Sequence, residues 1–149
     1  MFPLPEPMRL ALAAAADAAA RGEVPVGAAV MRGGQVIAVA ANAPRALHDP
    51  TAHAEILAIR EAARLLERER LDDCDLWVTL EPCAMCAGAI AHARIARLYW
   101  GAGDAKGGAV EHGPRFFTQP TCHHRPELYP GIGERESAGL LRGFFQAKR

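Results

Sequence analysis

The sequence contains no long hydrophobic run and no recognisable targeting segment. Its apolar stretch at residues 10–16 is followed by Asp17 and falls far short of the roughly 18 residues that a membrane span needs. Residues 1–5 include neither a basic stretch nor a long apolar core, so they do not resemble a secretory signal. We therefore expect a protein that does not cross a membrane and that resides in the cytoplasm.

An excess of charge of one sign is also absent, and cysteine is scarce. Lys+Arg and Asp+Glu number 17 each, so no overall positive field attracts nucleic acid, and a polyanion would have to bind a local patch. The four cysteines, in a reducing cytoplasm, are more often metal ligands or buried apolar groups than disulfides. Repeats, low-complexity segments and an evident linker are lacking as well.

What remains is the composition of an ordinary globular protein. Half of the 149 residues are hydrophobic and 23% are charged, which argues against a disordered or fibrous chain. A chain of this length buries roughly 70% of the surface that its unfolded form exposes. We expect a single domain over residues 1–149 that folds without disulfides.

The apolar pattern predicts helices and strands in one α/β domain. Pro7 suits the first turn of a helix that Gly22 ends, the pair at 33–34 (Gly-Gly) predicts a hairpin turn, and Thr51 suits an N-cap. The expected helices are residues 7–21, 52–68, 83–92 and 134–148. The expected strands are residues 24–31 and 35–42, an antiparallel pair, and then 76–80 and 96–100. Residues 101–133 lack a regular pattern, and the length of this segment suggests a functional role.

Two short segments provide the side chains of a hydrolytic metal site. Residues 51–55 contain His53 and Glu55, the latter in the first turn of the expected helix together with His53. Residues 81–86 contain Cys83 and Cys86, which are three apart at the start of a helix, so they share a face and the helix N-terminus favours thiolate. Imidazole and thiolate are zinc ligands, and a site with three protein ligands leaves a fourth position for water.

Glu55 is a carboxylate that such a site does not need as a ligand. It is two residues from His53 and therefore points elsewhere on the helix, toward a bound water rather than the metal. Zinc lowers the pKa of a water ligand to roughly 7, and a carboxylate that transfers protons adds about 100- to 10,000-fold in rate. The set fits hydrolytic attack on an electron-poor carbon with departure of an amine.

A Cys-x-x-Cys pair alone also fits two kinds of site that are not catalytic zinc. It could be a thioredoxin-like redox pair, or half of a structural zinc site completed by Cys74 or Cys122. A redox pair would leave His53 and Glu55 without a role, and a structural site would need a fourth ligand at an irregular spacing. Cys74 is most simply a small buried hydrophobic residue.

With both segments in place, the chain resembles the cytidine deaminase superfamily and, within it, the bacterial tRNA-specific adenosine deaminases. The resemblance covers nearly the whole chain, is most specific around the two zinc segments, and weakens over residues 110–133. The matching stretches are residues 23–28, Asn42, and residues 48–56, 78–90, 93–95 and 104–109.

The resemblance implies a three-layer α/β/α fold with a mixed central sheet, a homodimer and one Zn²⁺ per subunit. It also implies hydrolytic conversion of adenosine to inosine at the wobble position of a tRNA anticodon, typically of an arginine tRNA. The target base would leave an unpaired loop and enter a pocket above the zinc. His53, Cys83 and Cys86 would hold the zinc, and Glu55 would move a proton from water to the purine ring and the departing ammonia.

The resemblance also implies a set of substrate-binding residues. Asn42 and Ala54 would bind the target nucleoside, with Asp104 and Lys106 near it and the flanking nucleotides. From the residues alone, Asn42 could equally end a strand, and Asp104 with Lys106 could be a solvated loop pair.

The C-terminal helix and the irregular segment hold the remaining candidates. Phe144 and Phe145 suit the core on one side and base stacking on the other. The local basic patch would consist of Arg142, Lys148 and Arg149. Residues 122–124 (Cys-His-His) suggest a second metal, but three adjacent residues rarely converge on one ion, so a loop that contacts RNA or the core is preferred.

Two other functions fit the same zinc segments. A deaminase of a free base or nucleoside, such as guanine, cytosine or cytidine, would use the same core, whereas residues 23–27, residues 104–106 and the basic C-terminus favour tRNA. A non-catalytic, zinc-containing RNA-binding subunit is the second. Glu55 argues against it, because a structural site has no use for a proton carrier.

Overall fold

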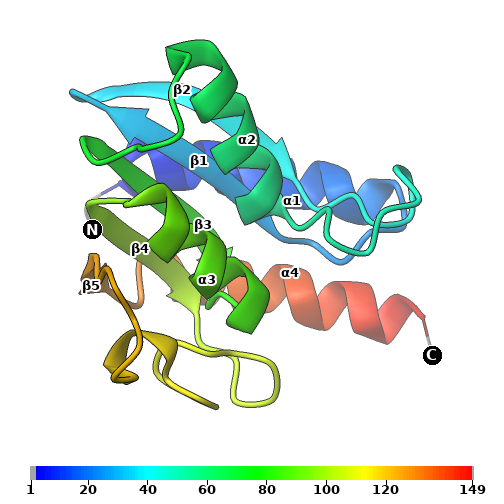
Figure 1. Ribbon diagram of the computed structural model, residues 1–149. Coiled ribbons are helices and arrows are strands. Elements are labelled where there is room, and N and C mark those ends of the chain that lie inside the picture. The colour runs from blue at the N-terminus through cyan, green and yellow to red at the C-terminus, as the bar shows by residue number, and fades with distance from the viewer. Residues whose placement is uncertain (1–2, 149) are drawn as a thin grey trace.

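Five strands form one mixed sheet between two layers of helices (Figure 1). The computed structural model describes residues 3–148. The strands are β1 (Gly27–Arg32), β2 (Gln35–Ala41), β3 (Cys74–Leu80), β4 (Arg97–Ala102) and β5 (Glu127–Tyr129), in the order β2-β1-β3-β4-β5. β1 is antiparallel to β2 and β3, whereas β3, β4 and β5 run parallel. The predicted α/β fold with a mixed central sheet is confirmed.

The helices pack in pairs on opposite faces of the sheet. α1 (Glu6–Ala20) and α4 (Glu134–Ala147) cover one face, and α2 (Ala54–Leu66) and α3 (Ala84–Ala93) cover the other (Figure 1). The alternation of β3 side chains explains the two cores: Leu76 and Val78 join the core beneath α2 and α3, whereas Trp77 joins the core beneath α1. Among residues 3–148, no helix is long and apolar enough to cross a membrane.

Glycine fixes two features of the N-terminal half. Gly33 and Gly34 have φ angles of +56° and +80°, which lets the chain turn between Arg32 and Gln35 in two residues, as predicted. Gly27 lies so close to α1 that a Cβ atom there would be 1.8 Å from the carbonyl oxygen of Ala11. Helix α1 therefore packs on β1 backbone to backbone at this point.

An aromatic stack extends across the face that α1 and α4 cover. The rings of Trp77 and Tyr99 are parallel with centroids 3.7 Å apart, and Tyr99 stacks on Tyr129 at 4.7 Å. These three residues lie on β3, β4 and β5, so the stack links neighbouring strands. The indole Nε1 of Trp77 is buried and has no hydrogen-bond partner among the described residues.

The predicted start of the second helix is wrong by two residues. Helix α2 begins at Ala54 with His53, in an extended conformation, as its N-cap, so only Glu55 lies in the first turn. Thr51 is not the cap, because its N–H and hydroxyl donate to Asp49 Oδ1 at 2.8 and 2.7 Å. Because Thr51 forms these local hydrogen bonds with Asp49, its hydroxyl does not cap the N-terminus of α2.

The irregular segment 101–133 contains two short elements that the sequence pattern did not predict. These are a 3₁₀ turn, η1 (Phe116–Thr118), and the edge strand β5. All three residues of β5 are exposed, so no alternation of apolar and polar residues indicates it. The strand is held by its register with β4, in which Arg97 lies opposite Glu127 and their side chains form an ion pair at 2.8 Å.

Candidate active site

The N-termini of α2 and α3 bring three metal-binding side chains together. Nδ1 of His53 lies 3.6 Å from Sγ of Cys83 and 3.5 Å from Sγ of Cys86. His53 and Cys83 are the N-cap residues of their helices, and Cys86 follows in the first turn of α3. Within residues 3–148, this is the only group of three or more His, Cys, Asp or Glu ligand atoms that all lie within 4.8 Å of one another.

The separations suit a zinc ion. Zinc binds sulfur at about 2.3 Å and imidazole nitrogen at about 2.0–2.1 Å, so a tetrahedral angle places those two ligands about 3.6 Å apart. The observed sulfur–nitrogen distances are 3.5 and 3.6 Å. The donor set, two sulfurs and one nitrogen, is also one that zinc prefers. The residues fit zinc, and three protein ligands leave one coordination position for water.

The three ligands also perturb one another's ionisation. Hydrogen bonds from Cys86 and His53 lower the pKa of the Cys83 thiol to about 4, against the opposing effect of burial. The hydrogen bond to Cys83 raises the pKa of His53. The bond with Cys83, together with burial, raises the pKa of Cys86. The cluster therefore holds one thiolate readily, as a metal site requires.

Glu55 lies beside this cluster but is not part of it. Its carboxylate does not belong to the group of mutually close ligand atoms, and the residue is only 4% exposed. Burial raises the pKa of the Glu55 carboxyl, which makes it a better proton carrier near neutrality. Glu55 lines a cavity of about 240 Å³ together with His53, Cys83 and Asn42. A buried carboxylate and two of the three metal-binding side chains, those of His53 and Cys83, thus face one small cavity.

A family profile described as the cytidine and deoxycytidylate deaminase zinc-binding region matches residues 4–102, a span that includes Glu55 and all three ligands. The chain belongs to this family. The match also confirms the predicted cofactor, because the His/Cys/Cys cluster is compatible with one zinc per subunit.

Individual relatives place the chain among the tRNA-specific adenosine deaminases of this family. A tRNA-specific adenosine deaminase of Agrobacterium fabrum is 59% identical over 142 residues, which are 95% of this chain and 93% of the relative. A structure from a study of A-to-I editing by tRNA:A34 deaminases has a TM-score of 0.90 and 58% identity, and the match covers 91% and 98% of the two chains. A guanine deaminase of Bacillus subtilis is more distant, with a TM-score of 0.65, 32% identity and coverage of 96% and 91%.

A groove adjoins the deaminase cavity and reaches the C-terminal helix. It measures about 750 Å³ and shares Val24, Leu80 and Asp104 with the smaller cavity. Lys106 lines the groove from one side, and Phe145 of α4 lines it from the other. Phe145 is 49% exposed, so part of its ring is free to stack. The structure thus brings Asp104 and Lys106 together with Phe145, which is far from them in the sequence.

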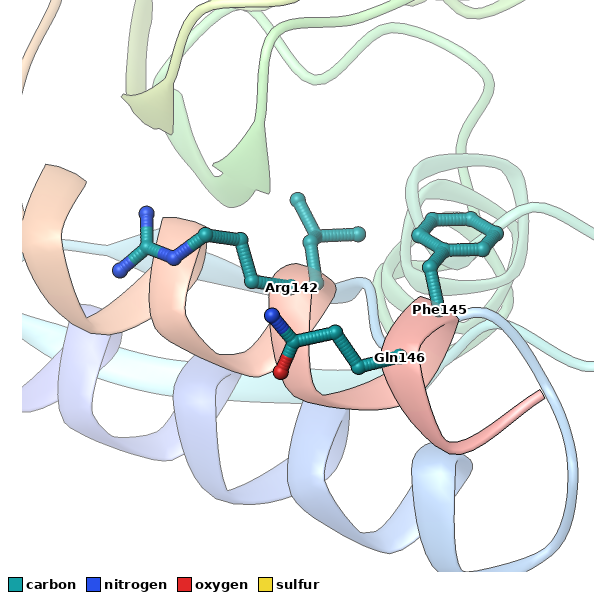
Figure 2. A pocket seen from close by; sticks show the side chains of 4 residues that line it. Arg142, Phe145 and Gln146 are labelled. Carbon is teal, nitrogen blue, oxygen red and sulfur yellow. The ribbon is translucent and has the colours of Figure 1, made fainter. Parts of the chain in front are cut away.

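Arg142 lies outside this groove. It borders a separate hollow of about 260 Å³ with Leu141, Phe145 and Gln146. Figure 2 shows that its side chain extends along α4 away from Phe145. Lys148 lines the groove and lies 5.0 Å from the ring centroid of Phe144. Arg149 is outside the described residues.

Asn42 and Ala54 occupy different surroundings. Asn42 follows β2, lines the cavity, and donates from Nδ2 to the carbonyl of Val24 at 3.3 Å, so it both ends a strand and faces the candidate substrate space. Ala54 is fully buried in the core beneath α2. A substrate contact from Ala54 would therefore have to come from its backbone.

The other two cysteines are remote from the zinc site. Cys74 is buried, and its thiol donates to Asp73 Oδ1 at 3.5 Å. Cys122 packs against the core and donates to the carbonyl of His124, whose Nε2 in turn donates to the carbonyl of Ile95 at 2.7 Å. The segment 122–124 therefore packs against the turn between α3 and β4, and among residues 3–148 it forms no second metal cluster.

Glu81 is a site residue to which the sequence pattern assigned no role. It directly precedes the Pro-Cys pair, lines the cavity and is 3% exposed. Burial raises the pKa of its carboxyl, but hydrogen bonds from Asp104 N–H, the His112 side chain and neighbouring backbone N–H groups outweigh burial and lower it. Only its position inside the 81–86 segment could have indicated a role, because its partners come from the irregular segment.

Proposed function

We propose that the protein is a zinc-dependent tRNA adenosine deaminase that converts adenosine to inosine at the wobble position of an anticodon, typically that of an arginine tRNA. The observation that favours this most is the junction between the small cavity over the zinc ligands and the groove toward α4. A base extruded from an unpaired loop fits the first space, and the nucleotides beside it fit the second.

The ligands and Glu55 have separate roles in this reaction. His53, Cys83 and Cys86 hold the zinc, which when bound supplies a water of lowered pKa as the nucleophile for C6 of adenine. Glu55 would carry the first proton of the water to N1 of the ring, where it stays, and would then carry the second, from the hydroxyl now on C6, to the departing amine. A C–O bond forms at C6, the C–N bond breaks, and ammonia leaves as the second product.

The groove residues would bind the RNA around the target. Asn42, which lines the cavity, would hydrogen-bond the nucleoside there, and Asp104 and Lys106 would contact it and its neighbours at the rim. Phe145 offers an exposed ring to a flanking base. Arg142 contacts RNA farther along α4, outside the groove.

The assay that tests this function compares substrates directly. The purified protein is incubated with an anticodon stem-loop that has adenosine at the wobble position and, separately, with free guanine, cytosine, adenosine and cytidine. We expect inosine only in the stem-loop. Turnover of a free base or nucleoside alone would contradict the tRNA assignment, and no turnover of any substrate would favour a non-catalytic RNA-binding subunit.

We further propose that residues 1–149 form one domain that acts as a homodimer in the cytoplasm, where tRNA is found. Half-buried Ile56 and Ile59 of α2 and Ala89 of α3 border a hollow of about 440 Å³, whose lining also includes Arg60, Glu69 and His92. Apolar side chains with charged groups of both signs beside them suit contact with a second copy of the chain. Sedimentation equilibrium should give twice the monomer mass.

A further inference from the structure

The segment 104–112 begins and ends on the same carboxylate, that of Glu81. The Glu81 side chain has no exposed surface. Its Oε1 accepts the backbone N–H of Asp104 at 3.0 Å, and its Oε2 accepts the backbone N–H groups of Val110, Glu111 and His112 at 3.1, 3.0 and 3.1 Å. Three successive N–H groups directed at one oxygen form an anion-binding nest, here filled by a side chain of the protein itself.

The turn at 104–107 faces the cavity and its groove. Asp104 Oδ1 accepts the N–H groups of Lys106 and Gly107 at 3.1 and 2.9 Å, which closes a tight turn. Asp104 and Gly107 line the cavity, and Asp104 and Lys106 line the groove. Because Glu81 holds the N–H of Asp104, it determines where this turn lies.

The fit between the segment and the carboxylate leaves no space for a side chain. A Cβ atom on Gly108 would lie 2.5 Å from both Cδ of Glu81 and the carbonyl oxygen of Asp104. The next residue is attached as well, because Ala109 N–H donates to the carbonyl of Pro82 at 2.9 Å. The segment is therefore anchored to Glu81 and Pro82, directly before the zinc ligand Cys83.

We propose that Glu81 is a positioning residue that sets the distance between the substrate-contacting turn at 104–107 and the zinc ligands. This inference rests on the proposed function, in which that turn binds RNA beside the target adenosine. The carboxylate acts through Asp104 and touches no substrate itself. Its loss would misplace the RNA contacts and leave the ligands and Glu55 in position.

The first test is Glu81→Gln. A carboxamide has one acceptor oxygen, so its NH₂ group must face either the Asp104 N–H or the three N–H groups at 110–112, and one anchor is lost. We expect KM for the stem-loop to rise roughly tenfold, as the loss of a buried hydrogen bond implies, while kcat and zinc content stay at the wild-type level. Glu61→Gln is the matched control, because Glu61 pairs only with Arg64 at the surface.

Hydrogen exchange gives a readout that is independent of turnover. In Glu81→Gln, the amides of Asp104 and residues 110–112 should exchange faster than in the wild type, and those of β3 should not. Binding of the stem-loop by the variants in a Glu55→Ala background, followed by fluorescence anisotropy, should weaken in parallel with the rise in KM.

Gly108→Ala probes the same contact without altering Glu81. It should raise KM with kcat unchanged, and the double variant with Glu81→Gln should be no worse than the more affected single variant, because both remove one contact. Gly139→Ala is the control, since a Cβ atom there meets nothing within 4 Å. Should Glu81→Gln fail to fold, Gly108→Ala decides whether the segment must fit Glu81, because it disturbs that fit while the carboxylate stays in place.

The outcomes separate this role from the proposed function. A wild-type enzyme inactive on the stem-loop would overturn the proposed function and this role with it. A wild-type enzyme that is active, with KM unchanged in the variants, would overturn the positioning role alone. A fall in kcat together with zinc content would also overturn it, because Glu81 would then support the metal site rather than the RNA.

Discussion

Glu55 and Glu81 are both buried carboxylates that line the same cavity, yet their surroundings shift the pKa in opposite directions. Burial dominates at Glu55 and raises its pKa. At Glu81 the N–H groups of segment 104–112 outweigh burial and lower the pKa. The number of hydrogen-bond donors around a carboxylate therefore separates the group that can carry a proton from the group that stays charged and holds a loop.

Substitution of Glu55 tests its catalytic role. Because Glu55 is not one of the mutually close ligand atoms, Glu55→Ala should keep zinc at one ion per chain while kcat falls at least about 100-fold. Metal analysis and single-turnover deamination of the stem-loop provide the two measurements. Wild-type activity in Glu55→Ala would refute the proton-transfer mechanism.

Substitution of Cys86 and of Cys122 should affect zinc content differently. Cys86→Ser removes one of three zinc ligands and should yield protein with little bound zinc, whereas Cys122→Ser should retain it, because that thiol donates to the carbonyl of His124 instead. Zinc content is read by atomic absorption after dialysis. A full complement of zinc in Cys86→Ser would remove that residue from the ligand set.

At the level of single residues, the sequence predicted the zinc ligands better than the residues that position the loops around them. His53, Cys83 and Cys86 could be predicted because helix starts bring ligands together at a recognisable spacing. Glu81 could not, because its role depends on backbone N–H groups of an irregular segment, which no residue type reveals. The N-cap prediction for Thr51 failed for a related reason, since Asp49 competes for the same hydrogen bonds.

Among the elements, α1 depends on the absence of a side chain at Gly27. Gly27→Ala would place a Cβ atom 1.8 Å from the Ala11 carbonyl oxygen, so α1 must move away from β1. We expect the free energy of unfolding to fall by about 1–3 kcal/mol, as overpacked cores do, measured as a lower urea midpoint. Gly139→Ala, in open space on α4, should not lower it.

The connection between α2 and β3 should show a defined pH dependence. Arg32 and Arg68 bond to Asp73 and lower the pKa of that carboxyl to about 2. The folded pKa lies below the unfolded value of about 3.8, so the stabilisation is complete above that pH and is lost as pH falls through about 2.

Asp73→Asn tests that dependence. The group is largely exposed, so its contribution at neutral pH should be below about 1 kcal/mol. The wild type should be slightly more stable than the variant at pH 6 and equally stable near pH 2, by thermal unfolding. A difference that grows on acidification would contradict the assignment.

Strands in which apolar and polar side chains alternate could be predicted from the sequence. A strand that is defined only by its pairing with a neighbour could not. The β1–β2 hairpin follows from apolar alternation and the glycine pair at 33–34. The edge strand β5 has three exposed residues, so only its pairing with β4 reveals it.

For the whole molecule, equal numbers of acidic and basic residues mean that RNA affinity must come from a few cations. In the groove these are Lys106 and Lys148. Each phosphate contact to a single strand contributes about 0.7 to the slope of log affinity against log salt. Lys148→Ala should reduce the magnitude of that slope by about this amount, whereas Arg64→Ala on α2 should leave it unchanged. An unchanged slope in Lys148→Ala would place RNA elsewhere.

The two tryptophans give the protein natural fluorophores on opposite sides of its sheet, one inside the aromatic stack and one outside it. Trp77 lies in the core beneath α1, with its indole N–H unpaired among the described residues, and Trp100 lies in the core beneath α2 and α3. A Trp→Phe substitution at either position leaves a single emitter that reports on one layer. Such a pair of variants shows whether the core beneath α1 melts together with the core beneath the zinc-binding helices or before it.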